Sequence, residues 1–192
     1  GPDGSHTAFT EYQLAVQWAD QRIERLTRAL CASITGWRFE PVVHALRALR
    51  GVDTVTAIGL LAEIGDLSRF AHPRKLMGYL GLVPAERSSG DTVQRGSITK
   101  TGNAHARRLL IQAAWHYRHT PRIGQQAHAR QQGLAEPVRA PAWKAQLRLS
   151  RRFAALDARG VHRNKVCVAI ARELAGFIWA IGLQALQPDT PT

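Results

Sequence analysis

Apolar residues recur every three or four positions along most of this chain, and this spacing limits the folds it can adopt. Between Lys165 and Leu186 the apolar residues are Val166, Ile170, Leu174, Phe177, Ile178 and Ile181. Spacing of this kind places side chains on one face of a helix. We find no strand-like alternation of any length, so the sequence predicts an all-α fold.

The same spacing divides the chain into regions. Residues 7–40 predict an amphipathic helical arm resembling the end of a coiled coil, with Leu14, Trp18, Ile23, Leu26, Leu30 and Ile34 on its apolar side. Residues 41–187 predict the compact domain, and residues 188–192 a loose tail. Residues 1–6 resemble the remnant of a cleaved tag rather than a signal peptide, because they contain no apolar core.

Two helices joined by a glycine turn are predicted around Gly51. Helical spacing stops at this glycine and resumes after Asp53 or Thr54, either of which is a good N-cap. This pattern resembles a helix-hairpin-helix motif, in which the backbone around Gly51 and Thr54 would face a phosphate. An ordinary hairpin of two helices remains the alternative.

Two polar segments interrupt the helices. Residues 83–102 are rich in glycine and polar residues, and a loop of this length inside a compact domain is expected to be functional or disordered. We favour function because the flanking helices are strong. Residues 120–141 contain three prolines and two glycines and predict an exposed loop holding Arg122, Arg130 and Arg139.

The charge balance indicates a polyanionic partner. Lys and Arg total 26 against 14 Asp and Glu, for a formal charge of +12. Nucleic acid is the first candidate, since the basic residues are spread through helices and loops and no apolar run approaches the ~20 residues of a membrane span. Arg148, Arg151 and Arg152 are candidates for contacts with a phosphate backbone. Trp115, Trp143 and Trp179 lie among apolar helical positions and are expected in the core.

Other chemistry has weak support in the sequence. Cys31 and Cys167 lie in apolar stretches without the spacing of metal ligands, so we expect buried free thiols. Free thiols indicate a reducing compartment such as the bacterial cytoplasm. There a protein that binds nucleic acid would be associated with the nucleoid. The eight histidines are scattered, and we expect no metal site in this chain.

A serine could perform chemistry in the segment 83–102. Ser88 and Ser89 precede Gly90, and the cations Arg95, Lys100, Arg107 and Arg108 follow. Serine is a poor nucleophile near neutral pH, so attack on a phosphodiester requires the phosphate to be held in line and its charge to be balanced. Thr99, the glycine loop 96–102 and the helix that Asn103 would cap could supply further donors. From spacing alone, a solvated turn is the better interpretation.

Several motifs together resemble the C-terminal transposase domain of the insertion-sequence-110 type. They are Gly81-Leu82-Val83-Pro84, Ser88-Ser89-Gly90, Gly96-Ser97-Ile98-Thr99-Lys100-Thr101-Gly102-Asn103, Arg107-Arg108-Leu109-Leu110, residues 142–149 and residues 169–174. The resemblance extends from about Leu46 to Ile181. It implies that the serine before Gly90 attacks a DNA strand and forms a phosphoserine bond. Ser89 is therefore the first candidate nucleophile and Ser88 the second.

The resemblance also implies parts that this sequence does not contain. Family members carry an N-terminal RuvC-like domain whose four acids bind Mg²⁺, act as oligomers, either dimers or tetramers, and are guided by a structured RNA. We find neither a βαβ pattern nor a plausible set of acids here, so we expect this chain alone to be inactive in catalysis and to retain binding of DNA or RNA. The competing hypothesis is a non-catalytic nucleic-acid-binding helix-hairpin-helix module.

Overall fold

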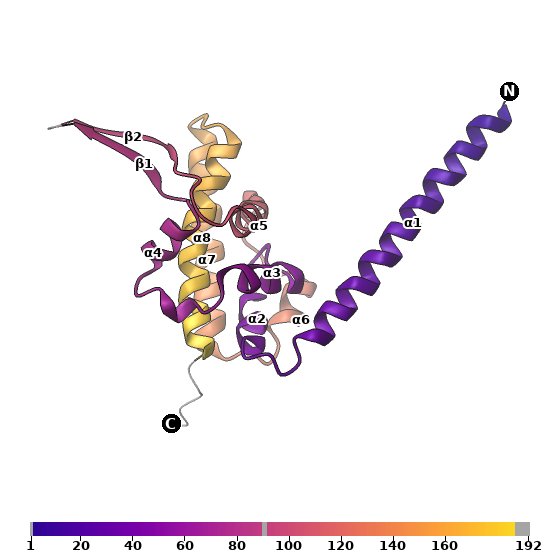
Figure 1. Ribbon diagram of the computed structural model, residues 1–192, viewed down its shortest axis with the longest axis horizontal. Coiled ribbons are helices and arrows are strands. Elements are labelled where there is room, and N and C mark those ends of the chain that lie inside the picture. Colours follow the sequence, from indigo (N-terminus) through magenta and orange to yellow (C-terminus); the bar gives the residue numbers. More distant parts are fainter. Residues whose placement is uncertain (1, 90–91, 187–192) are drawn as a thin grey trace. The chain divides into compact units, whose positions relative to one another are not determined.

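The computed structural model describes the backbone of residues 2–89 and 92–186, and the side chains of these residues except 2–3, 86–89, 92–95 and 126. Within these ranges the chain forms eight α-helices, two 3-10 turns and one pair of strands (Figure 1). The elements are α1 (Pro2–Ser33), α2 (Glu40–Leu46), α3 (Thr54–Ile64), η1 (Leu67–Arg69), α4 (Pro73–Tyr79), β1 (Pro84–Ser89), β2 (Thr92–Ile98), α5 (Ala104–Ala114), η2 (Trp115–Arg118), α6 (Gln125–Gln131), α7 (Glu136–Ala158) and α8 (Arg163–Leu186). The all-α class is confirmed.

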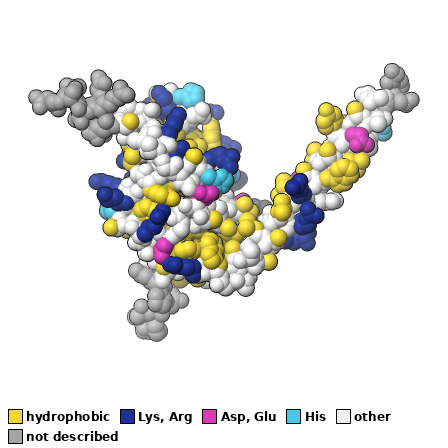
Figure 2. Space-filling view, in the orientation of Figure 1, with side chains coloured by type: hydrophobic (Ala, Val, Ile, Leu, Met, Phe, Trp, Pro, Cys, Tyr) yellow, Lys and Arg dark blue, Asp and Glu magenta, His cyan; other side chains and the backbone are white. Residues whose placement is uncertain are grey.

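The chain divides into two compact units, Gly1–Arg38 and Phe39–Thr192. The first consists mainly of α1, which is a single helix with a large exposed apolar surface. Its exposed apolar side chains are Phe9, Tyr12, Val16, Trp18, Ile23 and Leu26. Figure 2 shows hydrophobic side chains in yellow along this helix. Apolar side chains at helical spacing on an exposed helix agree with the amphipathic pattern of the sequence.

Helix α8 is the central helix of the second unit, because α2, α4, α5 and α7 all pack against it. Val166, Ile170, Leu174, Ile178 and Ile181 are buried as the periodicity predicts, whereas Phe177 is half-buried. By length and composition α8 would also be able to cross a membrane, which the sequence interpretation did not anticipate. Its packing against four helices instead identifies it as the core of this unit.

The expected helical hairpin around Gly51 forms in outline. Helix α2 ends at Leu46, the chain turns through Gly51 with a φ of 78°, and α3 begins at Thr54. Asp53 is the N-cap of α3, because its Oδ1 accepts a hydrogen bond from the Thr56 N–H at 2.7 Å.

The interpretation of residues 83–102 as a stretch without regular structure was wrong. Strands β1 and β2 pair there in an antiparallel hairpin, with an irregularity between Pro84 and Glu86 where β2 has the extra residue. Figure 1 shows this hairpin extending from the helices of its unit. The hairpin is polar, so it lacks the alternation by which half-buried strands are identified.

The interpretation of residues 120–141 as an exposed loop was wrong in part. Residues Gln125–Gln131 form α6, and α7 begins at Glu136. Pro137 lies in the first turn of α7, where the missing N–H has no intrahelical partner to lose. Pro141 lies inside the same helix and interrupts one hydrogen bond without ending the helix.

Candidate nucleic-acid interface

The β-hairpin is held at its base by two glycines that pack against backbone. Gly81 has a φ of 64° and Gly102 a φ of 92°. A Cβ on Gly81 would collide with the Thr101 carbonyl oxygen, and a Cβ on Gly102 would collide with the Tyr79 carbonyl oxygen. Positive φ and contact with backbone both require glycine at these positions. The glycines of the two motifs therefore fix how the hairpin leaves the helices.

A ladder of backbone hydrogen bonds continues this base. The Thr99 N–H donates to the Val83 carbonyl at 2.9 Å, and the Lys100 N–H donates to the Gly81 carbonyl at 3.2 Å. Asn103 extends the ladder toward α5, since its N–H donates to the Tyr79 carbonyl at 3.3 Å. The hairpin is thus tied both to α4 and to α5.

Asn103 and Arg107 both use their side chains at this base. Asn103 caps α5 as the sequence predicts, accepting from the Ala106 N–H at 2.8 Å, and its Nδ2 donates to Glu63 Oε2 at 2.6 Å. One Nη of Arg107 donates to the Leu80 carbonyl at 2.9 Å. These two predicted phosphate ligands therefore have contacts that position the hairpin.

The other basic candidates at this base are more accessible. Lys100 is exposed and has a positive φ of 56°. Arg108 is exposed, with a nitrogen 3.2 Å from His105 Nδ1. Thr99 is half-buried, and its Oγ1 is buried with no hydrogen-bond partner among the described residues.

The strand register places Ser88 and Ser89 at the far end of the hairpin from Lys100. Ser89 pairs with Thr92 and Ser88 with Val93, while the strand begins at Pro84. At about 3.3 Å per residue, the length of β1 separates Ser89 from the base by roughly 17 Å. The side chains of Ser88, Ser89 and Arg95 lie outside the described residues. The backbone therefore groups Lys100, Asn103 and Arg107, and it does not bring Ser89 beside them.

The Gly51 turn packs against the end of α5. A Cβ on Gly51 would lie 2.5 Å from the Ala113 carbonyl oxygen and 3.0 Å from the His116 ring. Thr54, the first residue of α3, is half-buried. The two helices and their turn are therefore held by tertiary contacts, which an ordinary helical hairpin would also show.

Helix α7 and the residue that follows it, Arg159, present a stripe of basic side chains, which we call the α7 stripe. Lys144, Arg148, Arg151, Arg152 and Arg159 line a shallow depression on this face. Glu173 of α8 accepts from Arg148 Nε at 2.8 Å and from Arg152 Nε at 2.6 Å. One carboxylate thus orders two guanidinium groups and leaves the stripe cationic, which suits contacts with successive phosphates.

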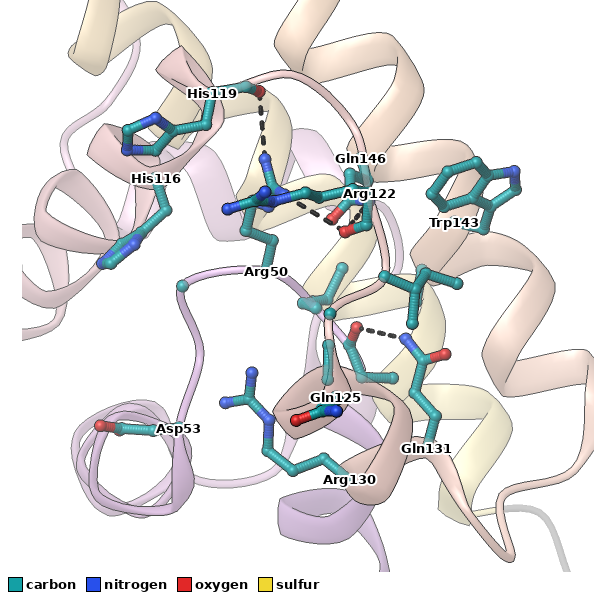
Figure 3. A pocket seen from close by; sticks show the side chains of 17 residues that line it. Arg50, Asp53, His116, His119, Arg122, Gln125, Arg130, Gln131, Trp143 and Gln146 are labelled. Carbon is teal, nitrogen blue, oxygen red and sulfur yellow. Dashed lines mark hydrogen bonds between the residues drawn. The ribbon is translucent and has the colours of Figure 1, made fainter.

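A second concave site, which we call the Arg50 cleft, has a volume of about 730 Å³. It is lined by the Gly51 turn, η2, the segment that follows η2, α6 and α7. The Arg50 guanidinium donates to the carbonyls of His119, Thr120 and Arg122 at 3.0, 3.1 and 3.2 Å. Figure 3 shows this guanidinium beside the segment that it ties down.

Burial and positive charge both act on the titratable groups of this cleft. Burial lowers the pKa of Arg50, and Arg122 lowers it further. The pKa of His116 is lowered by burial first and then by Arg118, His119 and Arg50. A lowered pKa keeps the His116 ring neutral over a wider pH range, and the arginine charges that contribute to this shift favour an anion in the cleft.

Little in the sequence indicates the Arg50 cleft. Its walls come from residues 48–53 and residues 116–146, which only the tertiary fold brings together. Trp143 was expected in the core, but its side chain is 38% exposed at the edge of this cleft (Figure 3). Trp115 and Trp179 are half-buried.

No described residues form a group of three or more His, Cys, Asp or Glu side chains that would hold a metal ion. The described side chains therefore do not fit the Mg²⁺ that the resemblance implies.

Comparison with known proteins identifies related sequences. Residues 43–129 match the family described as "Transposase IS116/IS110/IS902 family". A Sinorhizobium fredii protein named as a transposase, y4qE, is 47% identical over 182 residues, which are 95% of this chain and 45% of that protein. The Coxiella burnetii transposase for insertion sequence element IS1111A is 32% identical over 136 residues, covering 71% of this chain and 31% of that protein. The chain spans less than half the length of these curated relatives.

Proposed function

Residues 43–129 of this chain belong to the IS116/IS110/IS902 transposase family, and on that premise we propose that the chain is the DNA-handling C-terminal domain of a transposase. The β-hairpin supplies the nucleophile for strand cleavage and exchange. Ser89 is that nucleophile, and Ser88 is the second candidate. The observation that carries this proposal is the base of the hairpin. There Gly81 and Gly102 pack so closely against backbone atoms that neither can be replaced by a residue with a side chain.

A firmly held hairpin is useful because serine attack requires alignment. The Ser89 hydroxyl attacks a DNA phosphorus, forming a phosphoserine bond while one P–O bond of the strand breaks. The serine proton is released and the leaving deoxyribose oxygen takes up a proton. Alignment of this kind accounts for much of the rate enhancement in phosphoryl transfer. The bonds from Asn103 to Glu63 of α3 and from Arg107 to the Leu80 carbonyl hold the segments on either side of the hairpin in place.

The basic surfaces supply DNA affinity in this proposal. Lys and Arg side chains are dispersed over the face of the helical unit drawn in Figure 2, with fewer carboxylates between them. The α7 stripe runs along one phosphate backbone, and Lys100 and Arg108 contact the strand near the hairpin. Thr99 and the backbone around Gly51 and Thr54 are further candidate contacts.

The complete reaction depends on parts of the protein outside this chain. Mg²⁺ bound by a RuvC-like domain, a structured guide RNA and an oligomer on DNA belong to the full-length transposase in this proposal. The 192-residue chain alone binds nucleic acid without exchanging strands, and it acts in the bacterial cytoplasm.

Serine substitution in the full-length transposase tests the proposal. Ser89→Ala should abolish strand exchange while changing the DNA affinity by less than about twofold, because a hydroxyl contributes little to a charge-dominated complex. Ser33→Ala is the matched control, because the Ser33 hydroxyl donates to the Leu30 carbonyl in α1, outside the hairpin, and this variant should exchange strands normally. Retention of strand exchange by both Ser89→Ala and Ser88→Ala would leave only a non-catalytic nucleic-acid-binding module.

The contribution of the α7 stripe is tested by salt dependence. Arg151→Gln and Arg159→Gln should each reduce the slope of log affinity against log salt concentration by about 0.9 on duplex DNA. Arg28→Gln removes the same charge from α1, where Arg28 lies 3.9 Å from Glu24, and it should leave the slope unchanged.

A further inference from the structure

The Arg50 cleft has fixed walls. Besides the three hydrogen bonds from Arg50, the Gln146 side chain donates to the Arg122 carbonyl at 3.0 Å. The Ser150 hydroxyl donates to the His119 carbonyl at 3.1 Å. Gln146 and Ser150 are the buried polar side chains of the described core, so the segment following η2 is tied to α7 from beneath. A cleft held in this way is preorganised for a ligand.

A further hydrogen bond holds α6 against the segment before the Gly51 turn. The Gln131 side chain of α6 donates to the Ala48 carbonyl at 3.1 Å. This bond joins α6 to the segment that leads into the Gly51 turn. The segments that line the cleft, namely the Gly51 turn, the segment after η2, α6 and α7, therefore cannot separate without losing these hydrogen bonds. The bonds come from Arg50, Gln131 and Gln146.

The charge of the cleft selects an anion. Arg50, Arg122 and Arg130 line it together with a single carboxylate, that of Asp53. One oxygen of Asp53 already caps α3 through the Thr56 N–H. Arg50 and Arg122 are near enough for Arg122 to lower the pKa of Arg50. An anion between these guanidinium groups would relieve their repulsion.

Arg130 has donor capacity that the fold does not use. Its side chain is half-buried, and its Nε is buried without a hydrogen-bond partner among the described residues. Figure 3 shows the Arg130 side chain reaching from α6 into the space beside Asp53. A buried donor without a partner is unfavourable. The guanidinium that carries this Nε lines the cleft, where its other N–H groups would donate to a bound oxygen.

An aromatic surface lies at the edge of the same cleft. Trp143 of α7 is 38% exposed, and the neighbouring Ile123 is 46% exposed. An exposed tryptophan beside cationic donors suits a nucleotide, because every base has a π face that can stack on indole. A volume of about 730 Å³ holds a small number of nucleotides, whereas a duplex does not fit inside.

We infer that the Arg50 cleft binds one nucleotide of an unpaired strand, with its phosphate among Arg50, Arg122 and Arg130 and its base against Trp143. This inference rests on the proposed function, which provides strands that become unpaired during exchange. A DNA strand and an RNA strand share the recognised chemistry, a phosphate next to a base.

Binding of short fluorescent strands to the 192-residue chain tests the inference. The probes are a DNA single strand of about ten nucleotides, its RNA counterpart, a DNA duplex, and a DNA strand of the same length whose bases are removed. Arg130→Gln and Arg122→Gln should weaken single-strand binding about tenfold or more, as loss of charged hydrogen bonds does. Arg139→Gln is the matched control, because Arg139 pairs with Glu136 on an exposed surface outside the cleft. It should change the affinity by less than about twofold.

Recognition of the nucleobase is tested separately from recognition of the phosphate. Trp143→Ala should weaken binding of the normal strand by about fivefold or more, the range of one lost base stack, and should leave binding of the base-free strand unchanged. Tighter binding of DNA or of RNA tells which strand the cleft receives, and either result supports the inference.

Two outcomes would overturn the inference. In one, Arg130→Gln weakens single-strand and duplex binding equally; in the other, Arg139→Gln has the same effect as Arg130→Gln. Either would show that the cleft adds only general charge, while the proposed function would stand because duplex binding remains. Failure of the unaltered chain to bind any strand would contradict both this inference and the proposed function.

Discussion

Gly102→Ala should destabilise the protein through the base of the β-hairpin. Gly102 has a φ of 92°, and an alanine in the left-handed region is disfavoured by about 1–2 kcal/mol. The new methyl group also meets the Tyr79 carbonyl, which is held by the Asn103 N–H, and such overpacking costs about 1–3 kcal/mol. The two effects together predict a loss of about 2–5 kcal/mol in the free energy of unfolding.

Urea denaturation followed by far-ultraviolet circular dichroism measures this loss, and two other glycines separate its causes. Gly160 has a φ of 72° but open space around its Cβ position, so Gly160→Ala should cost only the conformational share. Gly78 lies in α4 with open space and without a positive φ, and Gly78→Ala should stabilise the helix by about 0.5–1 kcal/mol. Hydrogen exchange at the Thr99 and Lys100 amides should accelerate only in Gly102→Ala. Equal unfolding free energies for the Gly102 and Gly160 variants would refute the packing argument.

Three further predictions concern polar side chains in the interior or partly buried in the second unit. Tyr117→Phe should leave stability unchanged or raise it by about 1 kcal/mol in thermal unfolding, because the Tyr117 hydroxyl is buried without a hydrogen-bond partner among the described residues; a clear loss would contradict this. Arg50→Lys should lower stability by about 2–3 kcal/mol in the same assay, since one ammonium group cannot replace donation to three carbonyls. Burial raises the pKa of Cys167 from 9.0 to about 11, so the folded state binds this proton more tightly, and the thiol's contribution to stability should fall as the pH rises from 9 toward 11. Urea titrations of the wild type and Cys167→Ala across that interval measure the change, and an identical pH dependence of the two proteins would contradict it.

The helical framework could be predicted because it is periodic. Val166, Ile170 and Leu174 recur at the spacing of one helix face, and they are buried in α8. The capping residues Asp53 and Asn103 were also predictable, because a short polar side chain before an apolar run satisfies free N–H groups locally.

The hairpin and the Arg50 cleft could not be predicted in the same way. Residues Pro84–Ser89 and Thr92–Ile98 are mainly polar, so no apolar face marks their period. The contacts of Gly81 and Gly102 with backbone are long-range and appear only in the folded chain. The cleft likewise depends on Arg50 reaching carbonyls some seventy residues later in the sequence.

The candidate phosphate ligands were identified by residue type, and type does not reveal existing contacts. Arg107 was a plausible phosphate ligand by charge, yet it donates to the Leu80 carbonyl. Arg130 was only one cation in an expected loop, yet its Nε has no partner among the described residues. Hydrogen bonding within the fold therefore decides how many N–H donors each guanidinium keeps for a phosphate.

Mass spectrometry of a trapped adduct shows whether the hairpin serine forms a covalent bond with DNA. The full-length transposase is allowed to react with a DNA substrate that cannot complete exchange, and it is then digested with trypsin. Cleavage after Arg87 and Arg95 isolates residues 88–95 as one peptide. A nucleotide should be attached to this peptide, with fragmentation assigning it to Ser89. Strand exchange that proceeds with the adduct on a residue outside 88–95, or with no adduct at all, would contradict catalysis by Ser89.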